Sequence, residues 1–197
     1  GILARVALYA AGYSLRWELW NTFKTGEENA GTSNSLFADV NGKLINFKDA
    51  YAILKKTGTV DQCVVKAGLP YEQVKAENGD VLNKMIFMPV VNLHKADAEA
   101  VIDSYLTHMN PKAFELVFNN DGPEVQRLIK KVRDSGAKIF INSLWPELCG
   151  GHDDDRAVEL CQPDESWGWI IGQGARLIQT DRPALLLEYL RGRNLHE

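Results

Sequence analysis

The stretch RLIQTDRPALLLEYLR, residues 176–191, joins a short apolar run to a leucine-rich helix through a Thr-Asp-Arg-Pro turn. The run at 176–179 has the composition of a buried strand. Thr180 and Asp181 are residue types that cap helices, and Pro183 falls in the first turn, where its missing N–H costs nothing. The stretch therefore predicts a strand followed at once by a helix, which is the repeating unit of an α/β fold.

The same unit recurs upstream. After the apolar run at 114–118, for example, Val125, Leu128, Ile129 and Val132 are spaced as one face of a helix. Alternation of this kind predicts a parallel sheet with right-handed crossovers, its strands adjacent in chain order. The predicted strands are residues 36–40, 62–66, 85–91, 114–118, 138–142 and 176–179.

Two architectures fit this alternation, a closed TIM-type (β/α) barrel and an open doubly wound sheet. No GxGxxG or Walker loop follows any predicted strand, which removes the usual nucleotide-binding reading of an open sheet. We therefore expect a barrel of the TIM type that lacks its first two strand units, with a domain over 36–197 and an unassigned segment over 1–35.

Composition excludes several classes of protein. Of the 197 residues 45% are hydrophobic and 24% are charged, which is typical of a globular domain. The net charge of −4 and the scattered Lys and Arg residues indicate no nucleic-acid partner. No run approaches the roughly 18 apolar residues of a membrane span. The opening GILARVALYAAG is broken by Arg5 and is a poor signal peptide.

The three cysteines, Cys63, Cys149 and Cys161, are odd in number and have no CxxC spacing or clustered histidines. We expect free thiols rather than a zinc site or a disulfide framework.

Polar residues follow the predicted strands, where a barrel places its functional groups. Asp39 and Lys66 could hold a divalent cation and a phosphate, because oxygen ligands suit magnesium or calcium and an ammonium suits an anion. They could equally pair with each other or cap helices. Trp145 could wall a substrate pocket, whereas Trp167 and Trp169 are expected to pack in the core or against other helices. The strand-end residues are Asp39, Asn41, Lys66, Asn92, His94, Glu115, Asn119, Asn142, Trp145, Gln179 and Asp181.

The stretch CGGHDDDRA, residues 149–157, resembles a metal loop because three acids adjoin His152. Its simpler interpretation is a flexible Gly-Gly turn before a helix, whose N-terminus favours acids at 153–155. We expect the helix start.

Residues 141–196 carry, in order, a strand with a Trp loop, a Gly-Gly-His-Asp-Asp loop and a terminal Gln-Thr-Asp-Arg-Pro. In this order they resemble the C-terminal part of the glycerophosphodiester phosphodiesterase family, especially a bacterial branch. The resemblance extends upstream to about Leu36. It implies a phosphodiesterase-type barrel over 36–197 in which the Gln-Thr-Asp-Arg-Pro segment is the last strand and the start of the closing helix.

The resemblance also implies a function in lipid metabolism. Members are phosphoric diester hydrolases that convert glycerophosphodiesters to an alcohol and glycerol 3-phosphate with a divalent metal, magnesium or calcium, and the branch suggests the cell envelope. On this basis Asp39 corresponds to an acidic metal ligand, Lys66 lies near the phosphate, and Trp145 and Glu115 lie at the substrate. Glycerophosphodiester or glycerol phosphate would be the ligand.

The sequence departs from the family in its first third. The family's His-Arg pair is absent, the first histidine is His94, and the Glu-Asn of residues 27–31 follows no recognisable strand. The alternative is therefore a truncated or degenerate, non-catalytic relative that binds a phosphate ligand or needs a partner chain. Because lone sheet edges invite pairing, we expect a barrel that is either open or completed by residues 1–35 or by a second copy in a homo-oligomer.

Overall fold

The computed structural model describes residues 51–52, 55–56 and 64–196. The predicted strand at 36–40, with Asp39 inside it, and the segment 1–35 lie outside the described residues. The chain divides into two compact units with a boundary between Met88 and Pro89. Each unit is considered by itself.

The described part of the first unit is a strand followed by a helix. Strand β1 spans Val64–Ala67, α4 spans Tyr71–Asn78, and the 3-10 helix η3 spans Gly79–Lys84. Helix α4 buries Tyr71 and Val74, and Asn78 Nδ2 donates to the carbonyl oxygen of Val74 at 2.8 Å.

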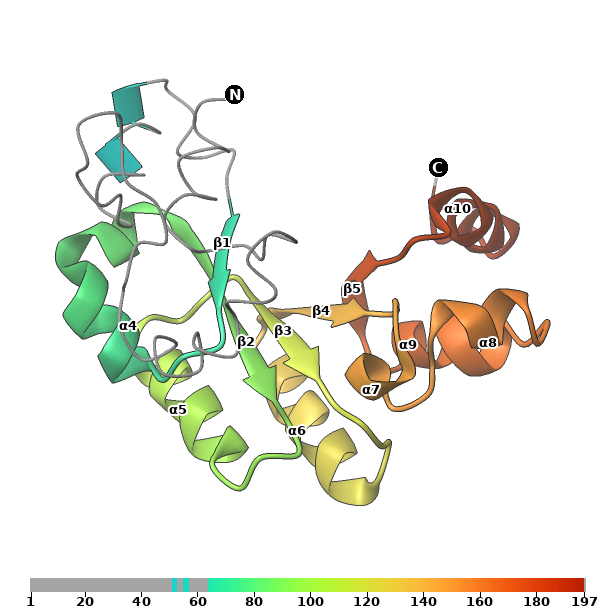
Figure 1. Ribbon diagram of the computed structural model, residues 1–197, viewed down its shortest axis with the longest axis horizontal. Helices are drawn as coiled ribbons and strands as arrows, with labels where there is room; N and C mark the ends of the chain where they lie inside the picture. The colour runs from blue at the N-terminus through green and yellow to red at the C-terminus, as the bar shows by residue number, and fades with distance from the viewer. Residues whose placement is uncertain (1–50, 53–54, 57–63, 197) are drawn as a thin grey trace, which may run out of the picture. The chain divides into compact units, whose positions relative to one another are not determined.

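The second unit continues the alternation of strands and helices, which can be followed by colour in Figure 1. Strand β2 crosses the boundary between the units, and the chain then runs through α5, β3, α6 and β4 before a longer connection leads to β5 and α10. The bounds are β2 Ile86–Asn92, α5 Ala98–His108, β3 Ala113–Val117, α6 Pro123–Asp134, β4 Lys138–Asn142, α7 Pro146–Cys149, α8 Asp154–Val158, the π-helical η4 Asp164–Gly168, α9 Trp169–Gly172, β5 Ala175–Gln179 and α10 Pro183–Gly192.

The strands form one sheet in the order β1-β2-β3-β4-β5. The pairs β2–β3, β3–β4 and β4–β5 are parallel. The structure thus confirms an α/β fold in which parallel strands follow one another in chain order, as predicted for the five strands that fall within the described residues. A barrel of the phosphodiesterase type remains a prediction.

Side chains of β3 and β4 alternate between the sheet face that packs against α5 and the opposite face. Phe114 in β3 meets Tyr105 of α5 edge to face, with ring centroids 6.4 Å apart, and Phe114 pairs in register with Ile139 of β4. These side chains therefore face the helices. Successive residues of a strand point to opposite faces, so Glu115 and its register partner Phe140 lie on the face away from α5.

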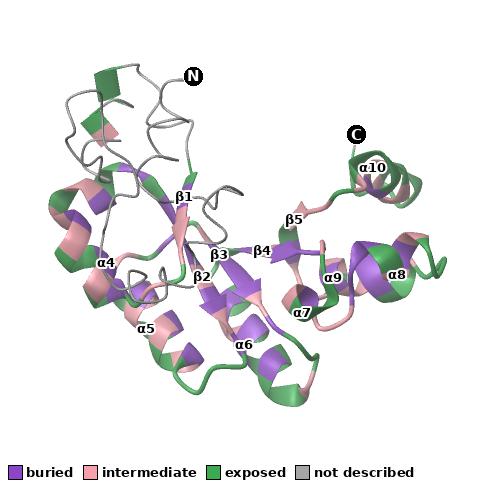
Figure 2. Cartoon of the chain, viewed as in Figure 1, coloured by how far each residue is buried: buried purple, intermediate pink, exposed green. Residues whose placement is uncertain are grey.

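Helix α6 shows why the predicted stripe forms a helix. Val125, Leu128, Ile129 and Val132 are all buried, whereas the intervening positions are mostly charged and exposed. Figure 2 shows this division, with buried β3 and β4 and largely exposed outer surfaces on α5 and α6. The prediction for this helix is confirmed.

Charged residues of α5 and α6 pair across the exposed surface. Arg127 lies 2.6 Å from Glu99 and 2.7 Å from Glu124, and Lys131 lies 2.8 Å from Glu99. Hydrogen bonds from Arg127 and then Lys131 lower the pKa of Glu99 to about 2.

The predicted cap of the last helix is wrong. Helix α10 begins with Pro183 in its first turn, as expected, but its N-cap residue is Arg182, which makes no side-chain cap hydrogen bond. Thr180 Oγ1 accepts from the backbone N–H of Arg182 at 2.9 Å and donates elsewhere. The hydroxyl hydrogen of Thr180 is donated to Asp154, and its oxygen accepts from the N-cap residue Arg182 rather than from the first turn of the helix.

Within the described ranges no helix is long and apolar enough to cross a membrane.

Candidate functional site

Two rows of side chains cross the sheet face that points away from α5. Register pairs Glu115 with Val90 on one side and Phe140 on the other, and Phe140 pairs with Leu177. The next row, two residues further along each strand, lies at the carboxyl ends of β2 to β5. We call it the strand-end row, and it consists of Asn92, Val117, Asn142 and Gln179.

Two of the four polar side chains in these rows are buried. Glu115 is 5% exposed and Asn142 is 8% exposed. Asn142 Oδ1 accepts from the backbone N–H of Leu144 at 3.0 Å, which leaves its Nδ2 without a hydrogen-bond partner among the described residues. Asn92 Oδ1 is buried and likewise has no partner there. Because buried polar atoms are nearly always paired, an unpaired buried acceptor needs an explanation.

The sequence-predicted site residues fall in different parts of the chain. Lys66 lies near the carboxyl end of β1 in the first unit, as predicted, and Glu115 lies in β3 of the second unit. Trp145 follows β4 as the N-cap residue of α7, with 60% of its surface exposed. Asp39 lies outside the described residues. The structure brings Glu115 together with the carboxamides of the strand-end row.

A metal centre does not form from the described residues alone, since they contain no group of three or more His, Cys, Asp or Glu side chains that could hold an ion. Magnesium and calcium bind six or more oxygen ligands, partly water. In the two rows Glu115 supplies the carboxylate, and no second acid joins it. We therefore derive no chemical step through a metal, and the proposed role of Asp39 depends on residues beyond the described part.

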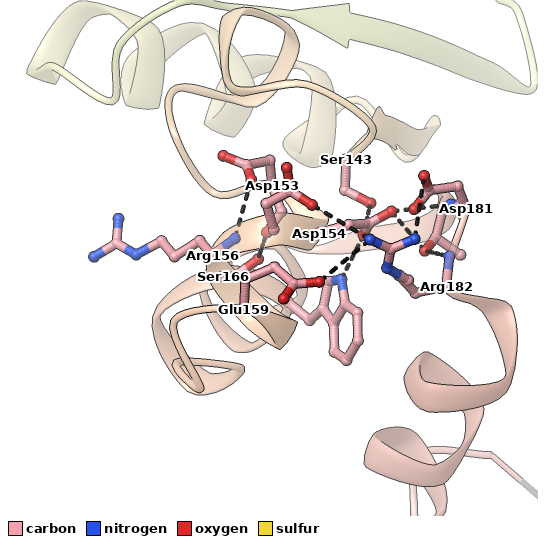
Figure 3. Close-up of polar contacts among 11 residues, drawn as sticks. Ser143, Asp153, Asp154, Arg156, Glu159, Ser166, Asp181 and Arg182 are labelled. Carbon is pink, nitrogen blue, oxygen red and sulfur yellow. Dashed lines mark hydrogen bonds and ion pairs between the residues drawn. The ribbon is translucent and has the colours of Figure 1, made fainter.

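A second polar constellation surrounds Asp154, which is 1% exposed (Figure 3). Its Oδ1 accepts from Trp167 Nε1 at 2.8 Å and lies 2.7 Å from Ser143 Oγ. Its Oδ2 accepts from Thr180 Oγ1 at 2.7 Å and from the backbone N–H of Asp181 at 3.0 Å. We call these five residues the Asp154 cluster. Four donors surround one carboxylate, so the cost of its burial is offset.

The Ser143 hydroxyl has a choice of two acceptors. It lies 2.7 Å from Asp154 Oδ1 and 2.8 Å from the carbonyl oxygen of Gln179, and a hydroxyl has a single hydrogen to donate. The backbone of Ser143 is also held, because its N–H donates to Gln179 and its carbonyl accepts from the N–H of Asp154. Ser143 is therefore a structural link between β4, β5 and α8, not an available nucleophile.

Asp153 begins α8. Its backbone is extended, and its side chain accepts from the backbone N–H of Arg156 at 3.0 Å, which is the geometry of an N-cap. Its carbonyl oxygen accepts from Ser166 Oγ at 2.7 Å. The predicted helix start at the Asp-Asp-Asp run is thereby confirmed. No metal-binding group that includes these acids is found among the described residues.

His152 is also fixed by its neighbours. Its ring stacks on Trp169 with centroids 3.8 Å apart, Nδ1 lies 2.6 Å from the carbonyl oxygen of Glu165, and Nε2 lies 3.3 Å from Asp121 Oδ2. Both ring nitrogens are therefore occupied. The core packing expected for the tryptophans is confirmed for Trp167, which is 2% exposed, whereas Trp169 is only partly buried and stacks on His152.

Cys149 and Cys161 are free thiols, as predicted, and Cys63 lies outside the described residues. Burial, and then the nearby charge of Asp153, raises the pKa of the Cys149 thiol to about 12. A protonated thiol is neither a nucleophile nor a metal ligand. Cys149 is consequently part of the core beside the Gly-Gly turn.

Sequence reasoning identified the positions of the strand-end row but missed the partners of Asp154. Ser143, Trp167 and Thr180 lie 11, 13 and 26 residues from it in the sequence. Their local patterns indicate a strand end, a packed aromatic and a helix cap, and none of these patterns signals a shared carboxylate.

Comparisons with known proteins agree with the extent of this unit. No curated protein matches the chain in sequence. A family model described as a domain of unknown function, DUF4996, matches residues 87–190, which is more than half of the chain. The matched range contains both the strand-end row and the Asp154 cluster. The chain therefore belongs to the DUF4996 family.

Proposed function

We propose that this chain is a glycerophosphodiester phosphodiesterase-like protein whose strand-end face binds a glycerophosphodiester or glycerol phosphate. The observation that carries the proposal is the position of Glu115, a buried carboxylate on the sheet face away from α5, one row before the carboxamides at the ends of the neighbouring strands. Parallel α/β proteins bind ligands at the carboxyl ends of their strands. The motif order in residues 141–196 supports the same assignment.

Each candidate residue has a separate proposed task. Lys66 would balance phosphate charge, Glu115 would accept a hydrogen bond from a substrate hydroxyl, and Trp145 would provide an apolar wall. Asp39 would contribute to holding magnesium or calcium, which as a Lewis acid polarises a phosphoryl oxygen. Hydrolysis would release an alcohol and glycerol 3-phosphate.

The proton-transfer group decides between catalysis and binding. The chain has four histidines. His152 has both ring nitrogens occupied, and His108 and His196 lie at or beyond helix ends, away from the strand ends. His94 is exposed and follows β2 directly, so we assign it the role of general acid or base if turnover occurs.

The second candidate function is a non-catalytic relative that binds the phosphate ligand. It is favoured by the structural use of His152, which leaves one histidine next to a strand end. A general acid and a general base each contribute roughly 10²- to 10⁴-fold to a rate, so a site with a single such group should turn over slowly. We expect diesterase activity close to the background, with ligand binding retained.

Two measurements on the full chain test the proposal. Calorimetry should detect glycerol 3-phosphate binding that weakens in Lys66→Ala, Asp39→Ala and Glu115→Gln but not in Glu147→Gln, which changes an exposed acid of α7. Hydrolysis of glycerophosphocholine with magnesium or calcium should be tested in parallel. Turnover that is lost in His94→Ala would establish the hydrolase, and binding without turnover would establish the non-catalytic relative. Absence of both binding and turnover would refute the proposal.

Completion of the sheet is proposed separately. In the sheet order β5 stands last, and we expect residues 1–35 or a second copy of the chain to complete the sheet. Sedimentation equilibrium across a range of concentrations separates the two, because only association between copies depends on concentration.

A further inference from the structure

The buried oxygen of Asn92 is the starting observation. Asn92 Oδ1 is inaccessible to solvent and has no hydrogen-bond partner among the described residues. A buried acceptor without a partner destabilises a fold, and its replacement by an apolar group of similar shape is neutral or stabilising. The retention of a carboxamide at this position is explained if a ligand donates a hydrogen bond to it.

Two further carboxamides stand at the same level of the sheet. Asn142 and Gln179 are direct register partners in β4 and β5. No described residue binds the Nδ2 group of Asn142 or the side chain of Gln179. Together with Asn92 Oδ1 they offer both donors and acceptors without any net charge, which is the set that hydroxyl groups require.

The spacing sets the size of the ligand. Neighbouring strands lie roughly 4.8 Å apart, so β2 and β4 are separated by about 10 Å across β3. A molecule that reaches both Asn92 and Asn142 must therefore be of the size of a six-membered ring with hydroxyl groups on opposite sides. Glycerol alone is too short to reach both.

The adjacent row supplies a surface for the carbon atoms of such a ring. Phe140 and Leu177 are register partners on the same face, and Leu177 is 44% exposed. Glu115 lies beside Phe140 in this row and can accept from a hydroxyl. Apolar contact beneath the ring and amide groups at its edge together suit a polyol and disfavour an anion.

We propose that the strand-end row binds a neutral polyhydroxy ring through Asn92, Asn142 and Gln179. The inference rests on the proposed function for its place in a reaction, since the ring would be the alcohol that a glycerophosphodiester releases. The row would then determine specificity for that alcohol, while the roles proposed for Lys66 and Asp39 are in binding the phosphate and its metal ion.

Binding of myo-inositol to the full chain tests the inference, with saturation-transfer NMR as the readout. Cyclohexanol, which has the ring but one hydroxyl, is the ligand control, and we expect it to bind at least ~10-fold more weakly. Asn92→Leu and Gln179→Leu should each lower the affinity for myo-inositol about tenfold, the equivalent of one good hydrogen bond. Gln173→Leu, which makes the same change at the opposite end of β5, should leave the affinity unchanged.

Asn92→Leu has a second readout that separates a ligand contact from a structural role. Because it removes the unpaired acceptor, its thermal unfolding midpoint should equal or exceed that of the parent while binding is lost. A lower midpoint with unchanged binding would assign Asn92 a structural role and overturn the inference, as would a parent chain that does not bind myo-inositol. If Asn92→Leu fails to fold, the affinity of Gln179→Leu for myo-inositol decides: a loss of about tenfold supports the inference and an unchanged affinity overturns it.

Failure of the proposed function gives a different pattern. Myo-inositol binding without binding or hydrolysis of any phosphate ligand would refute the function and leave the polyol site intact. Myo-inositol binding that is unaffected by both Asn92→Leu and Gln179→Leu would refute the polyol site alone.

Discussion

The Asp154 cluster and the strand-end row belong to the same unit of the chain, but their polar atoms are in opposite states. In the cluster, four donors meet one buried carboxylate at 2.7–3.0 Å. In the row, Asn92 Oδ1 is buried without a partner among the described residues. A region whose polar atoms are all hydrogen-bonded has no donor or acceptor left for a ligand. A region with an unpaired polar atom still has one.

The difference agrees with the preferred interpretation of the sequence, in which the acidic run begins a helix and the strand ends carry the candidate binding residues. The Gly-Gly-His-Asp-Asp-Asp loop resembles a site, and it is a structural junction. The isolated asparagines and glutamine at the ends of β2, β4 and β5 form no motif, and they are the better candidates for binding.

Replacement of Asp154 should have the largest effect. Asp154→Ala leaves the Trp167 indole N–H and the Thr180 hydroxyl without their common acceptor, and it leaves the Ser143 hydroxyl with only the carbonyl oxygen of Gln179. We therefore expect a loss of about 3–5 kcal/mol in the free energy of unfolding. Asp155→Ala is the control, because that side chain is 74% exposed and its ion pair with Arg182 is worth no more than about 1 kcal/mol. Urea unfolding followed by fluorescence measures both. Equal losses in the two variants would mean that the cluster is not a structural junction.

Thiol reactivity gives the next largest contrast. The pKa of Cys149 is raised to about 12 by burial, whereas Cys161 is exposed. At pH 8 we expect iodoacetamide to modify Cys161 about 100-fold faster than Cys149 in the folded chain. Peptide mapping by mass spectrometry resolves each site, and the difference should vanish in urea. Comparable rates under native conditions would show that the core beside the Gly-Gly turn is open.

Loss of the α8 cap should cost less. Asp153→Ala removes the acceptor for the backbone N–H of Arg156 and should lower the free energy of unfolding by about 1 kcal/mol. Asp153→Asn keeps a capping oxygen and should remain close to the parent in the same urea titration. If Asp153→Asn is as damaging as Asp153→Ala, the charge rather than the cap is what matters.

The smallest effect is expected for polar groups that are paired but exposed. The pKa of Glu99 in the folded chain is about 2, below its unfolded value, because Arg127 and Lys131 donate to it. Its contribution is therefore present above about pH 4.3 and is lost as the pH falls towards 2. The unfolding midpoint of Glu99→Gln should lie slightly below that of the parent at pH 7 and meet it near pH 2, and salt should reduce the gap. A gap that widens at low pH would contradict the assigned pairing.

Much of the fold could be predicted because its signals are local. The α6 stripe Val125, Leu128, Ile129 and Val132 has helical spacing, and the predicted strand at 85–91 is a continuous apolar run, so each element is visible within its own window. The positions of Asn92, Asn142 and Gln179 at the strand ends followed from the same patterns.

The contacts of Asp154 could not be predicted because they are not local. Thr180 illustrates the difficulty, since a Thr-Asp before Pro is as good a helix cap as it is a donor to a distant acid. Its hydroxyl donates to Asp154 26 residues away, and the helix begins at Arg182 without a side-chain cap. Only the packed structure shows that this hydroxyl donates to a distant acid and does not cap the first turn of the helix.

A single ¹H–¹⁵N NMR spectrum tests the difference between the two regions most directly, because it contains a reporter for each. The side-chain amide protons of Asn142 and Gln179 report on the strand-end row, and the indole proton of Trp167, which is bonded to Asp154, reports on the cluster. On titration with myo-inositol, the two carboxamide signals should shift in a saturable way while the Trp167 indole signal stays in place. A saturable shift of the Trp167 indole signal with unmoved carboxamides would contradict the account and make the Asp154 cluster the binding site.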